Sequence, residues 1–226
     1  TTIDAAGNST TATATRLFSL SNTGLVSDGY IAGAILFADA NGNGDQDVGE
    51  VSTITDEFGN FELEGGSGQL VLRGGTDIST GLAFAGTLLA PEGATTVTPL
   101  TTLVVSIVAA NGGSVTDAEA LLKDVLGLND IAGSFSDYDP IQAVLSQEPG
   151  SGNALTAAIT LQNTIAQGAA LLTGAGALAE DARAAVLAAI VEQITSNPNT
   201  PLDLTDSTTV EDVLGAAALD QSIPLD

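Results

Sequence analysis

The chain has 226 residues, of which 44% are hydrophobic, and its 28 acidic and 4 basic residues give a formal net charge of −24. The apolar residues suffice to bury a core, which excludes a disordered polymer. The negative charge disfavours binding to nucleic acid or anionic membranes and favours cations. The sequence has no Cys, Met, His or Trp, so it has no disulfide framework, thiolate zinc site, thiol nucleophile or histidine base.

These missing residue types remove most hydrolase designs, and we expect that the protein is not an enzyme. The lack of Met indicates a mature form or a segment of a longer translation product. A composition without Cys and rich in Thr, Gly, Ala and Asp is typical of secreted bacterial surface proteins, so we expect an extracellular location. No apolar run reaches the ~18 residues of a membrane span, so we expect no membrane insertion.

Short apolar runs separated by Gly, Asn and Asp clusters fill the first 98 residues and predict strands. We expect residues 1–20 to form an N-terminal strand or arm, with a strand over 11–20. The closely spaced runs after it predict an antiparallel β-sandwich over 21–98. Its predicted strands are 30–37, 51–55, 60–64, 69–73, 82–90 and 94–98.

The segment TDEFGNFEL (55–63) predicts a β-hairpin. Asp56 opens the turn, and Gly59 supplies a backbone that tolerates the required dihedral angles. Phe61 and Leu63 alternate with polar residues, so we expect both side chains to face the core.

After residue 98 the hydrophobic period becomes helical, which predicts a bundle of about six Ala-rich helices over 99–226. Thr98 followed by Pro99 predicts the start of the first helix, and Asp139 followed by Pro140 predicts a short one. Capping boxes are predicted from Thr116 to Glu119 and from Thr208 to Glu211. A four-residue stripe predicts the core face of a helix over 177–196: Leu178, Ala182, Val186, Ile190 and Ile194. The expected fold class is therefore α+β in separate domains.

The apolar run at 30–37 leads into the acidic segment FADANGNGDQDVGE (37–50). Counted from Asp39 as position 1, it has an acid or amide at positions 1, 3 and 5, glycine at 6 and Glu at 12, which is the calcium-loop pattern. Hard oxygen donors favour Ca²⁺ over zinc or copper. The predicted ligands are Asp39, Asn41, Asn43, Asp47 and bidentate Glu50, with Asp45 contributing its backbone carbonyl.

The alternative for this loop is a solvated turn rich in Asp and Asn. Strands on both sides argue against a helix–loop–helix calcium sensor, so a bound ion is expected to stabilise the β-domain. Three carboxylates and two amides predict a Kd on the order of 10⁻⁴–10⁻³ M, as in extracellular modules. Asp28 and Asp56 are candidates either for further oxygen donors or for turn formation and solvation.

The segments YIAGAILFADANGNGDQDVGE (30–50) and TITDEFGNFEL (53–63) resemble the B-type repeats of serine–aspartate-repeat surface proteins. They are also similar to carboxypeptidase-regulatory-like β-sandwich modules. The resemblance covers about 28–73, and it implies a calcium-rigidified sandwich with the ligand roles given above. Residues 1–15 resemble the last strands of bacterial Ig-like repeats. Residues 74–104 resemble a junction between such β-modules and helical regions in very large bacterial adhesins and calcium-binding surface proteins.

Three functions remain open. The first is a calcium-stabilised structural or adhesive module of a secreted bacterial cell-surface or matrix protein. The second is a self-assembling subunit of an extracellular filament or surface layer, whose N-terminal strand pairs with the sheet edge of another copy. The third and least favoured is a carbohydrate-binding module, because two Tyr and six Phe offer few rings for stacking on sugars. The expected partners are calcium, further copies of the chain and neighbouring surface-protein modules, without nucleic acid.

Overall fold

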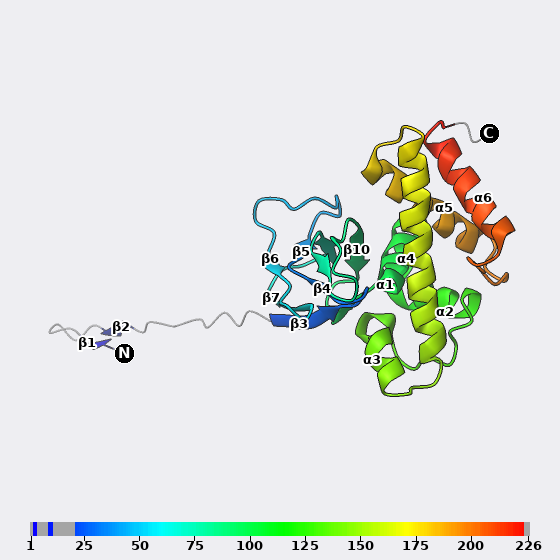
Figure 1. The fold of residues 1–226 in the computed structure, drawn as a ribbon. Coiled ribbons are helices and arrows are strands. Elements are labelled where there is room, and N and C mark those ends of the chain that lie inside the picture. The colour runs from blue at the N-terminus through cyan, green and yellow to red at the C-terminus, as the bar shows by residue number, and fades with distance from the viewer. Residues whose placement is uncertain (1, 4–8, 11–20, 224–226) are drawn as a thin grey trace.

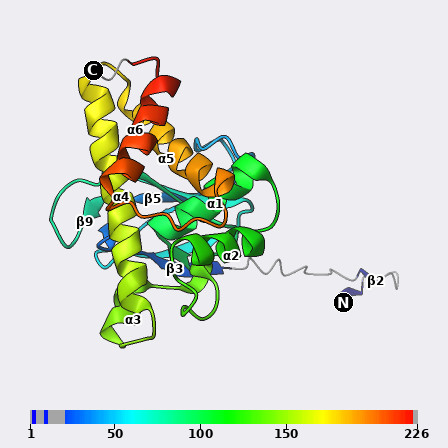
Figure 2. The same ribbon diagram turned by 90° about the vertical axis from the view of Figure 1, so that its right-hand side faces the viewer.

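The structure is a computed structural model that describes residues 2–3, 9–10 and 21–223. Strands occupy 21–97 and helices follow from Pro99, so the fold is mixed α+β in the predicted order. The predicted strand over 11–20 lies outside the described residues. β1 (Thr2–Ile3) and β2 (Ser9–Thr10) pair antiparallel, and Figures 1 and 2 show this pair well apart from the other strands.

Two sheets form the strand-rich part. The larger one has the strand order β10–β8–β5–β6 with antiparallel neighbours, and the smaller one has the order β11–β3–β7. A short pair, β4 (Ile31–Ala32) with β9 (Thr76–Asp77), lies beside them. The other strands are β3 (Ser21–Val26), β5 (Ile35–Asp39), β6 (Ser52–Ile54), β7 (Asn60–Glu64), β8 (Gln69–Arg73), β10 (Thr87–Ala90) and β11 (Thr96–Val97).

One strand pair corrects the expectation of a wholly antiparallel arrangement. β11 runs parallel to β3, with Thr96 opposite Leu25 and Val97 opposite Val26. A tight hairpin turn forces two strands to run antiparallel, whereas these two strands are separated by most of the strand-rich part. The chain therefore has room to bring β11 back in the same direction as β3.

The apolar side chains of both sheets meet in one cluster. Leu70 and Leu72 of β8 contribute from the four-stranded sheet, and Phe61 and Leu63 of β7 contribute from the three-stranded sheet. Successive side chains of a strand point to opposite faces. Gln69, Val71 and Arg73 therefore lie on the outer face of the four-stranded sheet, which becomes important for the site below.

The predicted strand over 30–37 is divided in the structure. Gly33 has a φ of +67°, a left-handed conformation that interrupts an extended run. Its N–H donates to the Thr55 carbonyl at 3.0 Å, and the Ala34 N–H donates to Thr55 Oγ1 at 2.9 Å. β4 and β5 are consequently two strands with different partners.

The turn at 56–59 is confirmed, but the hairpin around it is wrong. Asp56 Oδ1 accepts hydrogen bonds from the Phe58 and Asn60 N–H groups, and Gly59 has a φ of +82°. Phe61 and Leu63 are buried, as expected. β6 nevertheless pairs with β5 while β7 pairs with β3, so the turn carries the chain from one sheet to the other.

The helical part is built around the long helix α4, which packs against α3, α5 and α6. Figure 2, seen from the helical side, shows α4 running the whole height of this part. α1 contacts α2, α4, α5 and strand β10, so it joins the helices to the sheets. The helices are α1 (Pro99–Asn111), α2 (Val115–Val125), α3 (Pro140–Leu145), α4 (Ser151–Gly174), α5 (Ala179–Ser196) and α6 (Ser207–Asp220), with a 3₁₀ turn η1 at Phe135–Asp137.

The predicted core stripe is confirmed except at its first residue. Ala182, Val186, Ile190 and Ile194 are fully buried, whereas Leu178 is exposed because it lies just before α5. Within the described residues no single helix is long and apolar enough to cross a membrane. α1 and α2 together have the length and composition of a span, but they are bent by 117° at the break between them.

The predicted helix starts are confirmed at α1 and α3 and are two residues late at α2 and α6. Thr98 caps α1 and Asp139 caps α3. Ser114 caps α2 in a reciprocal box with Asp117, and Asp206 caps α6. Both are good capping residues upstream of the predicted threonines. Glu119 is thereby free for another role, and it accepts hydrogen bonds from Ser134 and Phe135.

Candidate metal centre

The predicted calcium loop, residues 39–50, leaves the end of the four-stranded sheet. It begins at Asp39, the last residue of β5, and returns to the sheet at β6. Asp39 lies opposite Gln69 of β8 and is 1% exposed, whereas most of the other loop residues are exposed. The first predicted ligand is thus fixed to the sheet and the remaining ones extend from it.

Asp39 is the most extensively hydrogen-bonded carboxylate of the loop. Its Oδ1 accepts from the Gly42 N–H at 2.7 Å, and its Oδ2 accepts from the Gly44 N–H at 2.8 Å and from Gln69 Nε2 at 3.0 Å. Burial by itself would raise the pKa of Asp39, but these hydrogen bonds together hold that pKa below its ordinary value. Asp39 is therefore ionised at neutral pH.

The side chains at positions 3, 5 and 9 meet at one carboxylate. Asn41 Nδ2 and Asn43 Nδ2 donate to Asp47 Oδ2 at 2.7 and 2.8 Å. The two amide oxygens turn back on the loop, where Asn41 Oδ1 accepts from the Asn43 N–H and Asn43 Oδ1 accepts from the Asp45 N–H. The amides thus hold a tight curl over 41–47.

Glu50 closes the loop. Its Oε1 accepts from the Ala40 N–H at 2.9 Å, and its Oε2 accepts from the Asp47 N–H at 3.0 Å. The Glu50 carboxylate therefore joins Ala40, near the start of the loop, to Asp47, near its end. Gly44, at position 6, has a φ of +80°, a conformation that glycine adopts readily and that other residues rarely do.

The Asp45 carboxylate is directed to the sheet. Its Oδ1 forms an ion pair with Arg73 Nη1 at 3.1 Å, in which both side chains are partly exposed. This contact is compatible with the prediction that Asp45 offers only its backbone carbonyl to an ion. The loop is thus tied to β8 twice, by Gln69 to Asp39 and by Arg73 to Asp45.

The donor set of the loop suits a hard cation. It consists of carboxylate, amide and carbonyl oxygens, which Ca²⁺ prefers. In the part of the chain that the structure describes, no group of three or more Asp, Glu, His or Cys side chains converges closely enough to hold a metal ion by itself. A cation in this loop would consequently depend on Asn41, Asn43 and backbone oxygens as well as on Asp39, Asp47 and Glu50.

The two further donor candidates lie elsewhere. Asp56 accepts hydrogen bonds from Phe58 and Asn60 of its own turn, which is the turn-forming alternative. Asp28 is largely buried, and burial together with the negative charge of Asp77 raises its pKa to about 6. Both Asp28 and Asp77 line a cavity of about 580 Å³ between the segment 77–86 and α4.

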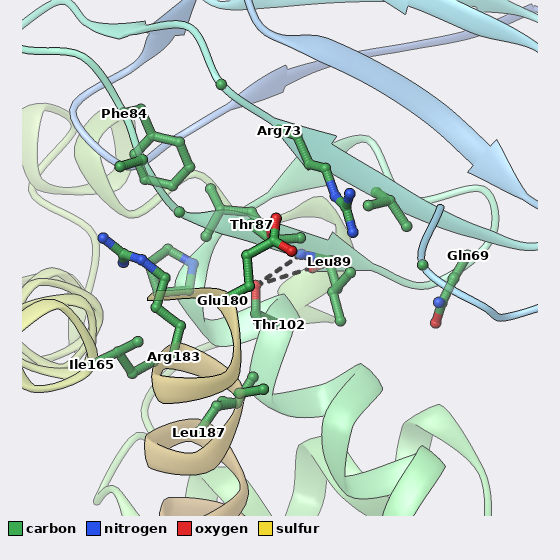
Figure 3. A pocket seen from close by; sticks show the side chains of 18 of the residues that line it. Gln69, Arg73, Phe84, Thr87, Leu89, Thr102, Ile165, Glu180, Arg183 and Leu187 are labelled. Atoms are coloured by element: carbon green, nitrogen blue, oxygen red, sulfur yellow. Dashed lines mark hydrogen bonds between the residues drawn. The ribbon is translucent and has the colours of Figure 1, made fainter. Parts of the chain in front are cut away.

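A second, larger cleft was not predicted from the sequence. It has a volume of about 740 Å³ and lies between the outer face of the four-stranded sheet and α5 (Figure 3). Residues 42–45 of the predicted calcium loop also line it. Its walls come from segments as distant as 69–74, 84–89 and 180–187, so only the fold brings them together.

Comparison of the chain with protein-family models, with curated proteins and with solved structures finds no match.

Proposed function

We propose that residues 21–97 form a calcium-stabilised β-sandwich module. The observation that carries the proposal is the loop 39–50, in which Asp39, Asn41, Asn43, Asp47 and Glu50 are all held by hydrogen bonds within one tight curl. Their spacing is that of a calcium loop, and their oxygen chemistry suits Ca²⁺. The two sheets that share one apolar cluster support the sandwich in this proposal.

Calcium acts here as a structural staple. The loop joins β5 to β6, and its contacts to Gln69 and Arg73 extend to β8. An ion held by Asp39 and Glu50 neutralises carboxylates at both ends of the loop and fixes three strands at one end of the sheet. Since strands and not helices flank the loop, ion binding has no helix pair to open.

We further propose that the chain is a structural or adhesive part of a secreted bacterial cell-surface or matrix protein. Its net charge of −24 keeps it soluble and attracts divalent cations. A Kd on the order of 10⁻⁴–10⁻³ M suits the millimolar calcium found outside cells. The helical part then serves as a spacer or docking domain that α1 joins to the sheets.

The test is calcium titration of the chelator-treated protein by calorimetry, followed by thermal unfolding with Ca²⁺, with Mg²⁺ and with EDTA. At a calcium concentration of about 100 times the Kd, the free energy of unfolding should rise by about 2.7 kcal/mol. Mg²⁺ should give a much smaller rise, because it demands a tighter octahedral site. Absence of binding heat and an unfolding temperature unchanged by EDTA would refute the calcium module.

Self-assembly of the chain is the second candidate, and two observations favour it. The pair β1–β2 stands apart from the other strands (Figure 1). β6 is an edge strand, and its Ile54 lies opposite Ile35 on the outer face with both side chains exposed. Light scattering in millimolar Ca²⁺ should detect polymers that deletion of residues 1–15 abolishes, whereas a monomer at all concentrations would contradict assembly.

A further inference from the structure

The cleft between the four-stranded sheet and α5 is lined by side chains of both charges. It contains Arg73 and Arg183, two of the three basic side chains among the described residues, the third being Lys123. Its acidic residues are Asp45, Glu180 and Asp181. Two positive and three negative charges give the cleft a net charge of −1, although the whole chain carries −24. A ligand that carries one positive and one negative charge therefore meets both signs of charge in this cleft.

Two opposite charges in this cleft do not neutralise one another. Glu180 and Arg183 are three residues apart on α5, a spacing at which such side chains commonly pair. Neither of them forms an ion pair within the part of the chain that the structure describes. Figure 3 shows the two side chains directed apart, Glu180 towards Thr87 and Arg183 towards the side of Phe84. One wall of the cleft therefore presents a separate anion and a separate cation.

Apolar side chains and a second arginine complete the lining. Phe84, Ile165 and Leu187 surround the two charges. On the opposite wall, Arg73 Nε is buried and has no hydrogen-bond partner among the described residues. Arg73 Nη1 is bonded to Asp45, so the positive charge on this wall is already paired.

The outer edge of β10 lies against α1, and residues of both elements line the cleft. The Leu89 N–H donates to Thr102 Oγ1 at 2.9 Å, and the Leu89 carbonyl accepts from Thr101 Oγ1 at 2.7 Å. The backbone of Leu89 is thus directed away from β8. Alternate residues of an antiparallel edge strand share this orientation, so the N–H and C=O of Thr87, two residues earlier in the cleft lining, also point outward. A peptide group is the natural partner of such an edge.

We propose that this cleft binds a short zwitterionic peptide, of two or three residues, with apolar side chains. Arg183 binds the terminal carboxylate, Glu180 binds the terminal ammonium group, and the edge of β10 at Thr87 bonds the peptide group. Phe84, Ile165 and Leu187 contact the side chains. The volume of about 740 Å³ falls within the range of small-molecule sites and suits a ligand of this size.

Titration with the dipeptide Leu-Leu in millimolar Ca²⁺, monitored by calorimetry or by chemical shifts, tests the proposal. N-acetyl-Leu-Leu lacks the ammonium group and Leu-Leu-amide lacks the carboxylate, so each should bind about tenfold more weakly, since a charged hydrogen bond contributes that much or more. Glu180→Gln should weaken Leu-Leu binding by a similar factor and leave N-acetyl-Leu-Leu unaffected. Arg183→Gln should likewise weaken Leu-Leu binding about tenfold, and it should leave the binding of Leu-Leu-amide unaffected.

Glu192→Gln is the matched control, because Glu192 lies on the same helix and is exposed outside the cleft. It should bind Leu-Leu as the unaltered protein does. Circular dichroism and the unfolding temperature establish that the variants are folded. Lack of Leu-Leu binding at about 10 mM, or binding of Leu-Leu by the Glu180→Gln and Arg183→Gln variants as tightly as by the unaltered protein, would overturn the proposal.

Discussion

Tyr30 Oη donates a hydrogen bond of 2.8 Å to Asp139 Oδ2 and so connects the strand-rich part to the start of α3. Asp139 is also the N-cap of α3 and accepts from the Ile141 N–H and from Ser27 Oγ. Tyr30 has a φ of +58°, a conformation that is strained for a residue with a side chain. The surrounding contacts have to hold it, and the bond to Asp139 is one of them.

We expect Tyr30→Phe to lower the free energy of unfolding by about 1 kcal/mol, because a partly buried hydrogen bond to a carboxylate is lost. Urea unfolding measures this change. Tyr138→Phe is the matched control, since the Tyr138 hydroxyl is buried without a hydrogen-bond partner among the described residues. That substitution should be neutral or stabilising. Equal losses in the two variants would show that the Tyr30–Asp139 bond contributes nothing specific.

We also expect the stabilising contribution of Tyr30 to depend on pH. Burial, the hydrogen bond to Asp139 and the charge of Asp139 raise the pKa of Tyr30 from 10.0 to about 12. A raised tyrosine pKa means that the folded state favours the protonated form, so its contribution is complete below about pH 10 and is lost as the pH rises towards 12. The difference in stability between the natural protein and Tyr30→Phe should therefore shrink over this range. A constant difference would contradict the assignment.

The raised pKa of Asp28 has a different consequence, because the group is ionised and destabilising at neutral pH. Its folded-state pKa of about 6, against an ordinary 3.8, means that the folded protein binds the proton more tightly than the unfolded chain. The ionised carboxylate thus destabilises the fold fully above about pH 6, and the penalty disappears as the pH falls towards 3.8. Asp28→Asn should raise the unfolding temperature near pH 8 and have little effect near pH 4. Asp124→Asn, at an exposed position on α2, should show no such pH-dependent gain.

The sequence predicts best where local chemistry decides the structure. β7 and β8 lie at the predicted residues, and α1 begins at the predicted cap. The residues predicted to bind calcium lie in one hydrogen-bonded curl, and their binding of an ion stays a prediction. β3 was missed, because SNTGLV has only two large apolar residues and its strand conformation depends on pairing with β7 and β11.

Long-range pairing explains the other errors. The turn at 56–59 has strong local signals, but nothing in TDEFGNFEL indicates that its two flanks join different sheets. The cleft with Arg73, Glu180 and Arg183 was invisible for the same reason, because its walls are more than a hundred residues apart. A cluster of basic residues within a short window would have drawn attention to it, whereas two isolated arginines did not.

The calcium loop predicts a ranking of variants. Glu50→Gln should weaken calcium binding about a hundredfold, because Glu50 is the predicted bidentate ligand and also closes the loop. Asp45→Asn should change the affinity much less, since the Asp45 carboxylate bonds Arg73 and only the carbonyl is a predicted ligand. Calcium titration by calorimetry, with unfolding curves in EDTA, separates lost affinity from lost folding. Equal effects of the two substitutions would contradict the assigned roles.

At Gly24 of β3 we expect a large loss of stability from the addition of one methyl group. A Cβ at this position would lie 2.1 Å from the Thr95 carbonyl oxygen and 2.7 Å from the Phe61 ring. The same carbonyl accepts the Leu25 N–H at 3.0 Å, so the strand cannot move away without losing the β3–β11 register. We therefore expect Gly24→Ala to lower the free energy of unfolding by about 3 kcal/mol.

Gly152→Ala provides the control for this prediction. Apart from its chain neighbours and the backbone of its own helix, nothing lies within 4 Å of a Cβ added at Gly152, which belongs to the first turn of α4. Ala has the higher helix propensity, so this variant should gain about 0.5 kcal/mol. Urea unfolding of both proteins gives the comparison. If Gly24→Ala were as stable as Gly152→Ala, the close contact between Gly24 and the Thr95 carbonyl could not exist. The parallel pairing of β3 with β11, which depends on that contact, would then be wrong.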